Sequence, residues 1–171
     1  ACEHSRAKGK DLWIRMGWLY LDTIEVMDIL TNENEKVIAL NQLEDFARID
    51  EIFEEHGERI AGVVTEFPTN PLLQACDLEK VKELCDKTNS LLIADPTMAS
   101  PKNAKVSGLA DVVVNSLTKY AGCEGDIMMG SLVFPKKSVL GRELLTQTAD
   151  RICPPFERDL LRMAEQIEHY D

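Results

Sequence analysis

The sequence lacks several features that define common classes of protein. Basic side chains are scarce: its 171 residues include 19 lysines and arginines against 30 aspartates and glutamates, for a net charge of −11. Nucleic acids and anionic membranes are bound by clustered lysine and arginine, so this balance argues against both partners. No apolar run approaches the roughly 20 residues that a membrane-spanning helix needs, and residues 1–6 do not resemble a signal peptide. We therefore expect a cytoplasmic protein.

Cysteine and histidine are also few and scattered. The cysteines number five, and no two have the C-x-x-C spacing, so we expect free thiols and neither a disulfide framework nor a zinc site. His4, His56 and His169 lie in separate polar segments, where surface or capping positions are expected, and none is an evident partner for a nucleophilic Cys123. Neither G-x-G-x-x-G nor a P-loop occurs, which disfavours a nucleotide-binding domain.

Short apolar runs alternate along the chain with segments of helical period. Strands are predicted over Leu12–Met16, Lys36–Leu40, Ile60–Phe67, Leu91–Ala94, Val112–Val114 and Ile127–Phe134. Helices are predicted over Thr23–Leu30 with Asp22 and Glu25 as a capping box, Glu44–His56 closed by Gly57, Leu78–Lys87 capped by Asp77, Glu143–Asp150 and Phe156–His169. Continuous apolar strands are typical of parallel sheets buried on both faces. The order predicts one α/β domain over residues 1–171: a three-layer, mostly parallel sheet with helices on both faces.

The most informative stretch is Asn115-Ser116-Leu117-Thr118-Lys119-Tyr120, which directly follows an apolar run. Asp95, 24 residues before Lys119, ends the preceding apolar run. Ligands of α/β sheets bind beyond the carboxyl ends of the strands, where both residues are expected. A lysine amine can form an imine with pyridoxal phosphate, hydroxyls can hold its phosphate, and a carboxylate can pair with its pyridine nitrogen. This spacing therefore suggests a site for covalently bound pyridoxal 5'-phosphate.

Three motifs connect this pattern with a known family: Glu66-Phe67-Pro68-Thr69-Asn70-Pro71, Asp95-Pro96-Thr97 and Ser116-Leu117-Thr118-Lys119-Tyr120. In order and spacing they resemble the cystathionine γ-synthase-like enzymes of cysteine and methionine metabolism, which have fold type I and use pyridoxal phosphate. The resemblance extends over most of residues 12–170. It implies that Lys119 binds the cofactor and then shuttles protons, with burial near cations lowering the lysine pKa. It also implies that Asp95 keeps the pyridine nitrogen protonated, so that the ring remains an electron sink.

The same resemblance implies further contacts to the cofactor. Asn70 would donate to the phenolic oxygen, Ser116 and Thr118 would contact the phosphate, and Thr97 would lie near the ring. Local structural roles are the alternatives: an Asx turn before Pro71 for Asn70, and capping of the turn after the strand for the hydroxyls.

Other positions depart from the family pattern. A family tyrosine that stacks on the ring and assists proton transfer matches Tyr20, but the two glycines that normally follow it are replaced by Leu21-Asp22. Packing of Tyr20 beside Trp18 is the alternative. Glu124 stands where many members have histidine, whereas Asp126 and Gly130 keep their spacing. We interpret the chain as a divergent branch of the family.

Complete members of the family are much longer. The resemblance places the chain in the core of the large cofactor domain, without the N-terminal arm that reaches a neighbouring subunit and without the C-terminal small domain that holds the substrate carboxylate. The sequence also begins without methionine in a polar segment, so we expect further residues to precede it, and the resemblance implies that a glycine-containing phosphate loop is among them. We expect this chain alone to be inactive and the parent enzyme to be a homotetramer.

The function predicted for the parent is that of a transferase in transsulfuration and methionine biosynthesis. It would act on a small amino acid, most simply by γ-replacement on a homoserine ester. A γ- or β-lyase of the same family is the nearest alternative. A non-catalytic α/β scaffold that has lost the chemistry is the alternative from another class, and the intact set of Lys119, Asp95 and Asn70 counts against it.

Overall fold

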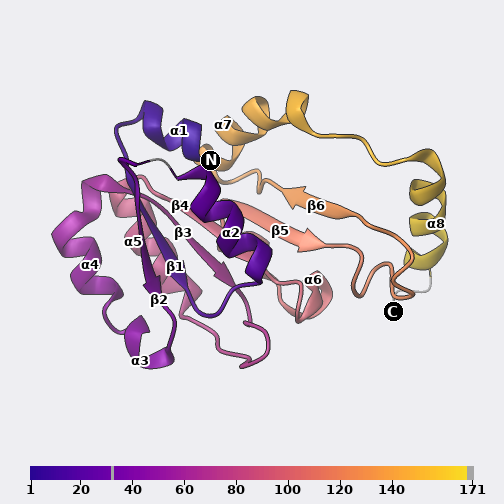
Figure 1. Cartoon of the computed structure of the whole chain (residues 1–171), viewed down its shortest axis with the longest axis horizontal. Coiled ribbons are helices and arrows are strands. Elements are labelled where there is room, and N and C mark those ends of the chain that lie inside the picture. Colours follow the sequence, from indigo (N-terminus) through magenta and orange to yellow (C-terminus); the bar gives the residue numbers. More distant parts are fainter. Residues whose placement is uncertain (32, 169–171) are drawn as a thin grey trace.

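The computed structural model describes residues 1–31 and 33–168, which form a six-stranded sheet with helices on both faces (Figure 1). The strands are β1 (Leu12–Met16), β2 (Lys36–Leu40), β3 (Ile60–Glu66), β4 (Leu91–Asp95), β5 (Val112–Ser116) and β6 (Gly130–Val133). Their order in the sheet is β2-β1-β3-β4-β5-β6. The first five strands are parallel, and β6 pairs antiparallel with β5, so the mostly parallel sheet predicted from the sequence is confirmed.

The helices occupy most of the segments between strands. They are α1 (Cys2–Ala7), α2 (Leu21–Leu30), α3 (Leu43–Phe46), α4 (Ile49–His56), α5 (Leu78–Thr88), α6 (Ser100–Asn103), α7 (Val139–Thr148) and α8 (Glu157–Ile167), with 3-10 turns at Gly57–Arg59, Val106–Gly108 and Ala149–Arg151. As predicted, the Asp77 carboxylate caps α5 by accepting the Lys80 amide at 3.0 Å. Across residues 1–31 and 33–168, no helix combines the length and apolar character that crossing a membrane requires.

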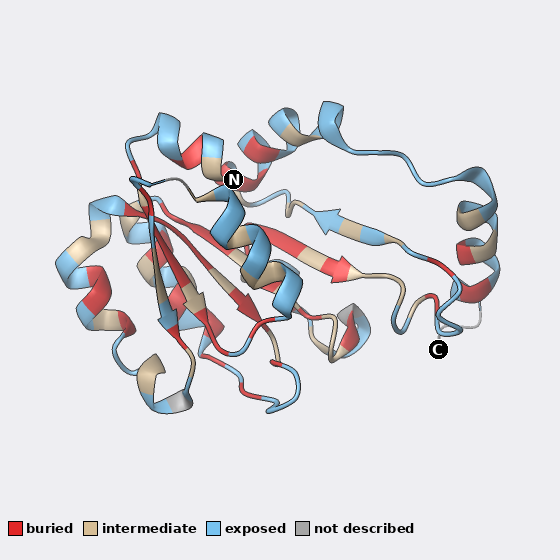
Figure 2. Cartoon of the chain, viewed as in Figure 1, coloured by how far each residue is buried: buried red, intermediate tan, exposed pale blue. Residues whose placement is uncertain are grey.

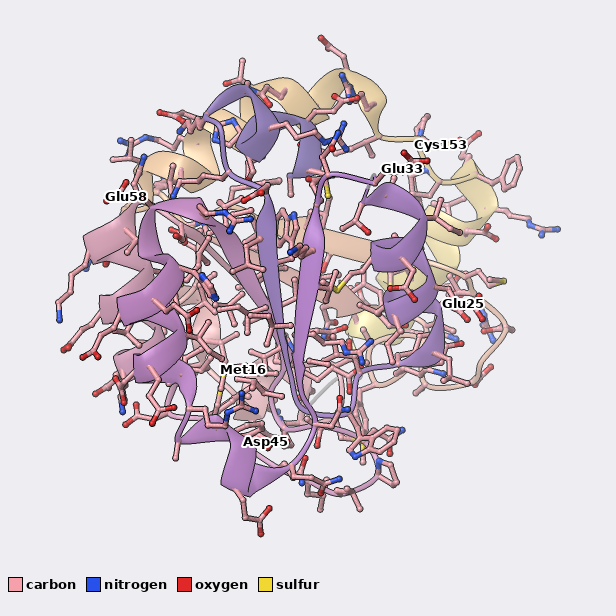
Figure 3. All side chains as sticks on the ribbon, turned by 60° about the vertical axis from the view of Figure 1, so that its left-hand side comes forward. Met16, Glu25, Glu33, Asp45, Glu58 and Cys153 are labelled. Atoms are coloured by element: carbon pink, nitrogen blue, oxygen red, sulfur yellow. The ribbon has the colours of Figure 1, made fainter. Side chains whose placement is uncertain are left out.

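The alternation of side chains along each strand divides the core into two layers. On one face of the sheet, Ile14 and Met16 of β1 join an apolar cluster that includes α4 and α5. On the other face, Trp13 joins a cluster that includes α7 and the inner side of α2. Figure 3 shows this division with β1 and β2 seen nearly edge-on, Met16 on the side of α3 and α4 and Glu25 on α2 opposite. Figure 2 shows the same core as mostly buried central strands beneath helices whose outer sides are exposed, whereas β6 at the edge of the sheet is largely exposed.

Helix α2 begins earlier than its sequence predicts. Tyr20 rather than Asp22 precedes the first turn, and its carbonyl accepts the amides of Thr23 and Ile24 at 2.9 and 3.2 Å. Within the described residues no side chain caps the helix, so the predicted capping box of Asp22 and Glu25 is wrong. The amide of Tyr20 donates instead to a carboxylate of β3, which places the helix start at the edge of the sheet.

The single helix predicted over Glu44–His56 is divided into α3 and α4. A capping box formed by Gln42 and Asp45 starts α3. After α3, the Arg48 amide donates to the Asp45 carbonyl at 3.0 Å, and this tighter turn separates α3 from α4. Gly57 follows α4 as predicted, but with a right-handed φ of −39°, so this end does not need glycine for its conformation.

The last strand and helix pair also differ at their boundaries. Strand β6 begins at Gly130 rather than Ile127, because β5 ends at Ser116 and offers residues 127–129 no partner in the ladder of the described chain. Helix α7 begins at Val139 rather than Glu143, since the Ser138 hydroxyl accepts the Gly141 amide at 2.8 Å and caps an earlier turn. Helix α8 lies within its predicted range, whose last residue, His169, falls outside the described residues.

The histidine predicted at the surface in residues 1–6 is buried. The imidazole Nδ1 of His4 lies 3.2 Å from Gln147 Nε2, and its Nε2 lies 3.4 Å from Glu143 Oε2. Burial lowers the pKa of His4, which favours the neutral ring between α1 and α7.

Asp111 joins three elements at the amino end of β5. Its fully buried carboxylate accepts the Ser138 hydroxyl at 2.5 Å, the Lys82 ammonium at 3.0 Å and the Leu92 amide at 2.8 Å. One side chain therefore connects α5, β4 and the start of α7.

Replacing Asp111 by alanine is expected to lower the free energy of unfolding by about 3 kcal/mol, because buried donors lose their acceptor and Lys82 loses a buried counter-ion. Urea denaturation measures the change. Asp86→Ala is the matched control, since Asp86 pairs with the same ammonium but its side chain is 63% exposed. Equal losses in the two variants would contradict the importance of burial.

Candidate active site

Three acidic or hydroxyl side chains end neighbouring parallel strands. Glu66 ends β3, Asp95 ends β4 and Ser116 ends β5. Glu66 and Asp95 are direct partners in the register of the sheet, and Lys119 follows Ser116 in the next loop. The three motifs singled out in the sequence therefore meet at the carboxyl edge of β3, β4 and β5, where α/β sheets bind ligands.

Thr97 links the ends of β4 and β5. Its hydroxyl donates to Asp95 Oδ1 at 2.5 Å, and its amide donates to the same oxygen at 2.9 Å. The hydroxyl also accepts the Ser116 amide at 2.9 Å and the Asn115 side-chain amide at 3.3 Å. Among the described residues, both hydrogen bonds to the Asp95 carboxylate end on Oδ1, so Oδ2 is open to another donor. Burial raises the pKa of Asp95, and the bonds from Thr97 oppose that rise.

Glu66 links two of the predicted cofactor contacts, and sequence reasoning missed its importance. Its Oε1 accepts the Tyr20 amide at 2.5 Å, and its Oε2 accepts the Asn70 amide at 3.3 Å. The side chain is buried, which is unusual for a glutamate, and two backbone amides bind its carboxylate. The available signal was an acidic residue that ends an otherwise apolar strand at the start of the first motif.

Burial raises the pKa of the Glu66 carboxyl above its ordinary value of 4.5, and the charge of Asp95 adds to the rise. The folded protein therefore binds this proton more tightly than the unfolded chain. The resulting contribution to stability is complete below pH 4.5 and is lost as the pH rises through the folded-state pKa.

Replacing Glu66 by glutamine is expected to remove this loss of stability at rising pH, because glutamine does not titrate. The side chain keeps one amide oxygen as an acceptor. The free energy of unfolding of the variant should fall less than that of the unmodified chain as the pH rises from 4.5. Urea denaturation at a series of pH values measures the difference. Glu25→Gln, on exposed α2, is the control and should leave the pH profile unchanged; identical profiles for all three proteins would refute the prediction.

The loop that carries Lys119 is fastened to the segment before β6. The Thr118 hydroxyl accepts the Met129 amide at 3.0 Å, and the Leu117 amide donates to the Met129 carbonyl at 2.9 Å. Lys119 itself is exposed, so the burial expected for this lysine is absent from the described structure. Any contact of Thr118 with a phosphate must share the hydroxyl with Met129.

Tyr20 and Asn70 both lie at the surface beside this edge. Tyr20 is 61% exposed, and Trp18 is 44% exposed. Tyr20 is therefore not buried under the start of α2, and its packing beside Trp18, the structural alternative in the sequence, stays a prediction. The side chain of Asn70 is exposed while its amide is held by Glu66.

Comparison with known proteins supports the resemblance seen in the motifs. Residues 5–161 match the family described as Cys/Met metabolism PLP-dependent enzyme. The chain belongs to this family. Pyridoxal 5'-phosphate is the cofactor of the family, and the fold type I assignment agrees with the sheet described above.

Individual relatives cover the chain to different extents. Over 168 residues it is 34% identical to the L-2-amino-4-chloropent-4-enoate dechlorinase/desaturase of Streptantibioticus cattleyicolor, covering 96% of this chain and 33% of that protein. Over 136 residues it is 32% identical to the cystathionine gamma-synthase/O-acetylhomoserine (thiol)-lyase of Bacillus subtilis, covering 78% of this chain and 36% of that protein. The chain spans about a third of the length of these relatives.

A solved structure gives the same fold. The cystathionine gamma synthase of Xanthomonas oryzae pv. oryzae in complex with cystathionine superposes with a TM-score of 0.77 and 23% identity, covering 95% of this chain and 41% of that chain.

The donor set at the sheet edge of this family member fits pyridoxal phosphate. Lys119 offers an exposed amine, Asp95 offers a carboxylate whose Oδ2 can accept a further hydrogen bond, and Ser116 offers a hydroxyl at the end of β5. An amine, a carboxylate and a hydroxyl are the groups that an aldehyde, a pyridine nitrogen and a phosphate require.

A recess of about 870 Å³ elsewhere in the chain is lined by none of the residues of the candidate site. It is lined by Lys82, Asp111, Lys136 and Ser138 at the amino end of β5. Because ligands of α/β sheets bind at the opposite, carboxyl end, this recess is separate from the candidate site.

Proposed function

We propose that the protein to which this chain belongs uses pyridoxal phosphate to replace the γ substituent of a small amino acid, with a homoserine ester as the substrate class. The observation that carries the proposal is the placement of Lys119 and Asp95 beyond neighbouring parallel strands in a member of this family.

Each proposed residue has one task at the sheet edge. Lys119 would hold the cofactor covalently and would then take a proton from Cα of the substrate. Asp95 would accept a hydrogen bond from the ring nitrogen through Oδ2, while Thr97 orients the carboxylate through Oδ1. Bound pyridoxal phosphate supplies an electron sink for negative charge on the substrate.

The remaining residues would bind and orient. Asn70 would donate to the phenolic oxygen, and Ser116 and Thr118 would donate to the phosphate. Tyr20 would cover the ring and assist proton transfer. Glu66 supports both sides of this arrangement, since it fixes the amides of Tyr20 and Asn70.

Elimination is the second candidate reaction. It is favoured by the relative that matches 96% of this chain, whose name describes loss of chlorine from C4 of an amino acid, which is its γ carbon. Replacement and elimination share the departure of a γ substituent and differ in whether a new substituent then takes its place. A β-lyase would need a leaving group one carbon closer.

We also propose that residues 1–171 are the core of a larger cofactor domain, in a parent enzyme that is a homotetramer. The larger domain is supported by relatives that are about two to three times as long as this chain. The group that holds the substrate carboxylate would come from the rest of the parent, so this chain alone is expected to bind cofactor without turnover.

Reductive labelling tests the site. The chain is incubated with pyridoxal phosphate, reduced with borohydride and mapped by mass spectrometry, and the label is expected at Lys119. Lys10 serves as an internal control, because its buried ammonium donates to the carbonyls of Glu58, Ile60 and Thr88. Labelling spread over exposed lysines with no preference for Lys119 would refute the specific site.

A further inference from the structure

Helix α8 lies against the loop that carries Lys119. The chain from Ile152 to Phe156 is extended and carries α8 away from α7, toward the connection between β5 and β6 (Figure 1). The residues of α8 that become buried there are Met163 and Gln166.

Arg162 of α8 binds two acidic residues of that connection. Its Nη2 lies 2.5 Å from Glu124 Oε2, and its Nε lies 3.1 Å from Asp126 Oδ2. A third carboxylate, from Glu165 on the same helix, lies 3.5 Å from Nη1 and orients the guanidinium. A planar guanidinium can serve several carboxylates at once, which a lysine ammonium cannot do with the same geometry.

Gln166 adds a buried contact one helical turn further on. Its Nε2 donates to Asp126 Oδ1 at 3.3 Å, so both oxygens of that carboxylate are bound to α8. This hydrogen bond, together with Arg162, lowers the pKa of Asp126 and keeps it charged. The side chain of Gln166 is 7% exposed, and its Oε1 lies 3.5 Å from where a Cβ on Gly122 would stand. The helix thus reaches the loop backbone three residues after Lys119.

The lysine consequently lies between two anchors. On one side, Thr118 is bonded to Met129 beside β6. On the other side, Glu124 and Asp126 are bonded to α8. Lys119 and Tyr120 between them are exposed, and backbone hydrogen bonds from Lys119 to Ser116 at 3.4 Å and from Gly122 to Leu117 at 2.6 Å act together with these anchors.

We propose that Arg162 and Gln166 are positioning residues that fix the Lys119 loop for its cofactor. The inference rests on the proposed function of Lys119. Glu124 takes part as a partner of Arg162. Neither α8 residue touches a reacting atom; both act through Asp126 and the loop backbone.

Arg162→Met in the full chain tests the proposal, with Arg158→Met as the matched control. Arg158 lies on the same helix, is 87% exposed at its side chain, and pairs with its neighbour Asp159. Hydrogen exchange of peptides covering residues 117–126 measures loop order without any cofactor. Borohydride trapping with pyridoxal phosphate measures the yield of label at Lys119.

Exchange in Arg162→Met is expected to be about two- to fivefold faster, the range that exposed ion pairs give, with a lower yield of label at Lys119. Glu124→Gln should give a smaller change in the same direction, and circular dichroism checks that each variant is folded. Unchanged exchange in Arg162→Met, or equal acceleration in Arg158→Met, overturns the proposal. Faster exchange with an unchanged yield at Lys119 overturns the positioning of the lysine.

One further outcome separates this proposal from the one on which it rests. Faster exchange in Arg162→Met, with no label at Lys119 even in the unmodified chain, supports the hold of α8 on the loop and overturns the assignment of Lys119 to the cofactor.

Discussion

Replacing Lys119 by alanine is expected to lower turnover by the full-length enzyme by about 10⁴-fold, because proton transfer by a positioned base contributes up to that factor. On the proposed assignment, the variant would lose both the residue that holds pyridoxal phosphate and the base for the Cα proton. Steady-state kinetics of the purified full-length protein measure the loss, and absorbance of the bound cofactor reports the attachment.

Lys102→Ala is the matched control for this variant. Lys102 is also exposed, on the short helix α6 that follows β4, and has no assigned contact with cofactor. Its removal is expected to leave turnover unchanged. Turnover retained in Lys119→Ala would refute the assignment of the lysine, whereas equal losses in both variants would point to a general effect of lysine removal.

Replacing Asp95 by asparagine is expected to lower kcat by about 10²- to 10³-fold, the cost of losing one preorganised electrostatic contact. The amide keeps the shape of the side chain and one oxygen for the Thr97 hydroxyl, but it does not keep the ring nitrogen protonated. The rate of the full-length variant measures this loss.

Thr97→Val provides a comparison, because it keeps the charge of Asp95 and removes only the hydroxyl that orients it. A smaller loss of rate is expected in Thr97→Val than in Asp95→Asn. If Asp95→Asn retained full activity, the carboxylate would have no electrostatic function in the reaction. Denaturation of both variants separates effects on folding from effects on chemistry.

The sequence was sufficient for the sheet and for the place of the proposed site. Continuous apolar runs such as Leu91–Ala94 have few alternatives to buried parallel strands, and the residues just beyond such strands meet at one edge by geometry. The placement of Asp95 and Ser116 at the carboxyl ends of β4 and β5 follows from this local pattern, although the predicted strands ended one and two residues earlier.

Features that depend on contacts between distant segments were not predictable in this way. The start of α2 is set by the bond from Tyr20 to Glu66, 46 residues away, and this bond overrides the capping signal of Asp22. Likewise, α8 shows an amphipathic pattern, but its pattern does not say which loop it contacts. Arg162 and Glu124 are 38 residues apart, and their ion pair appears only in the folded chain.

The antiparallel pairing of β6 gives the two halves of the proposed site different local stabilities. Asp95 ends a strand with neighbours on both sides, whereas Lys119 lies at the tip of a hairpin whose outer strand is at the edge of the sheet. Proteins open locally in cooperative units, and edge hairpins with exposed tips open at lower free energy than central strands. Opening of β6 and of the loop that carries Lys119 is therefore expected at a lower free energy than opening of β4, which ends at Asp95.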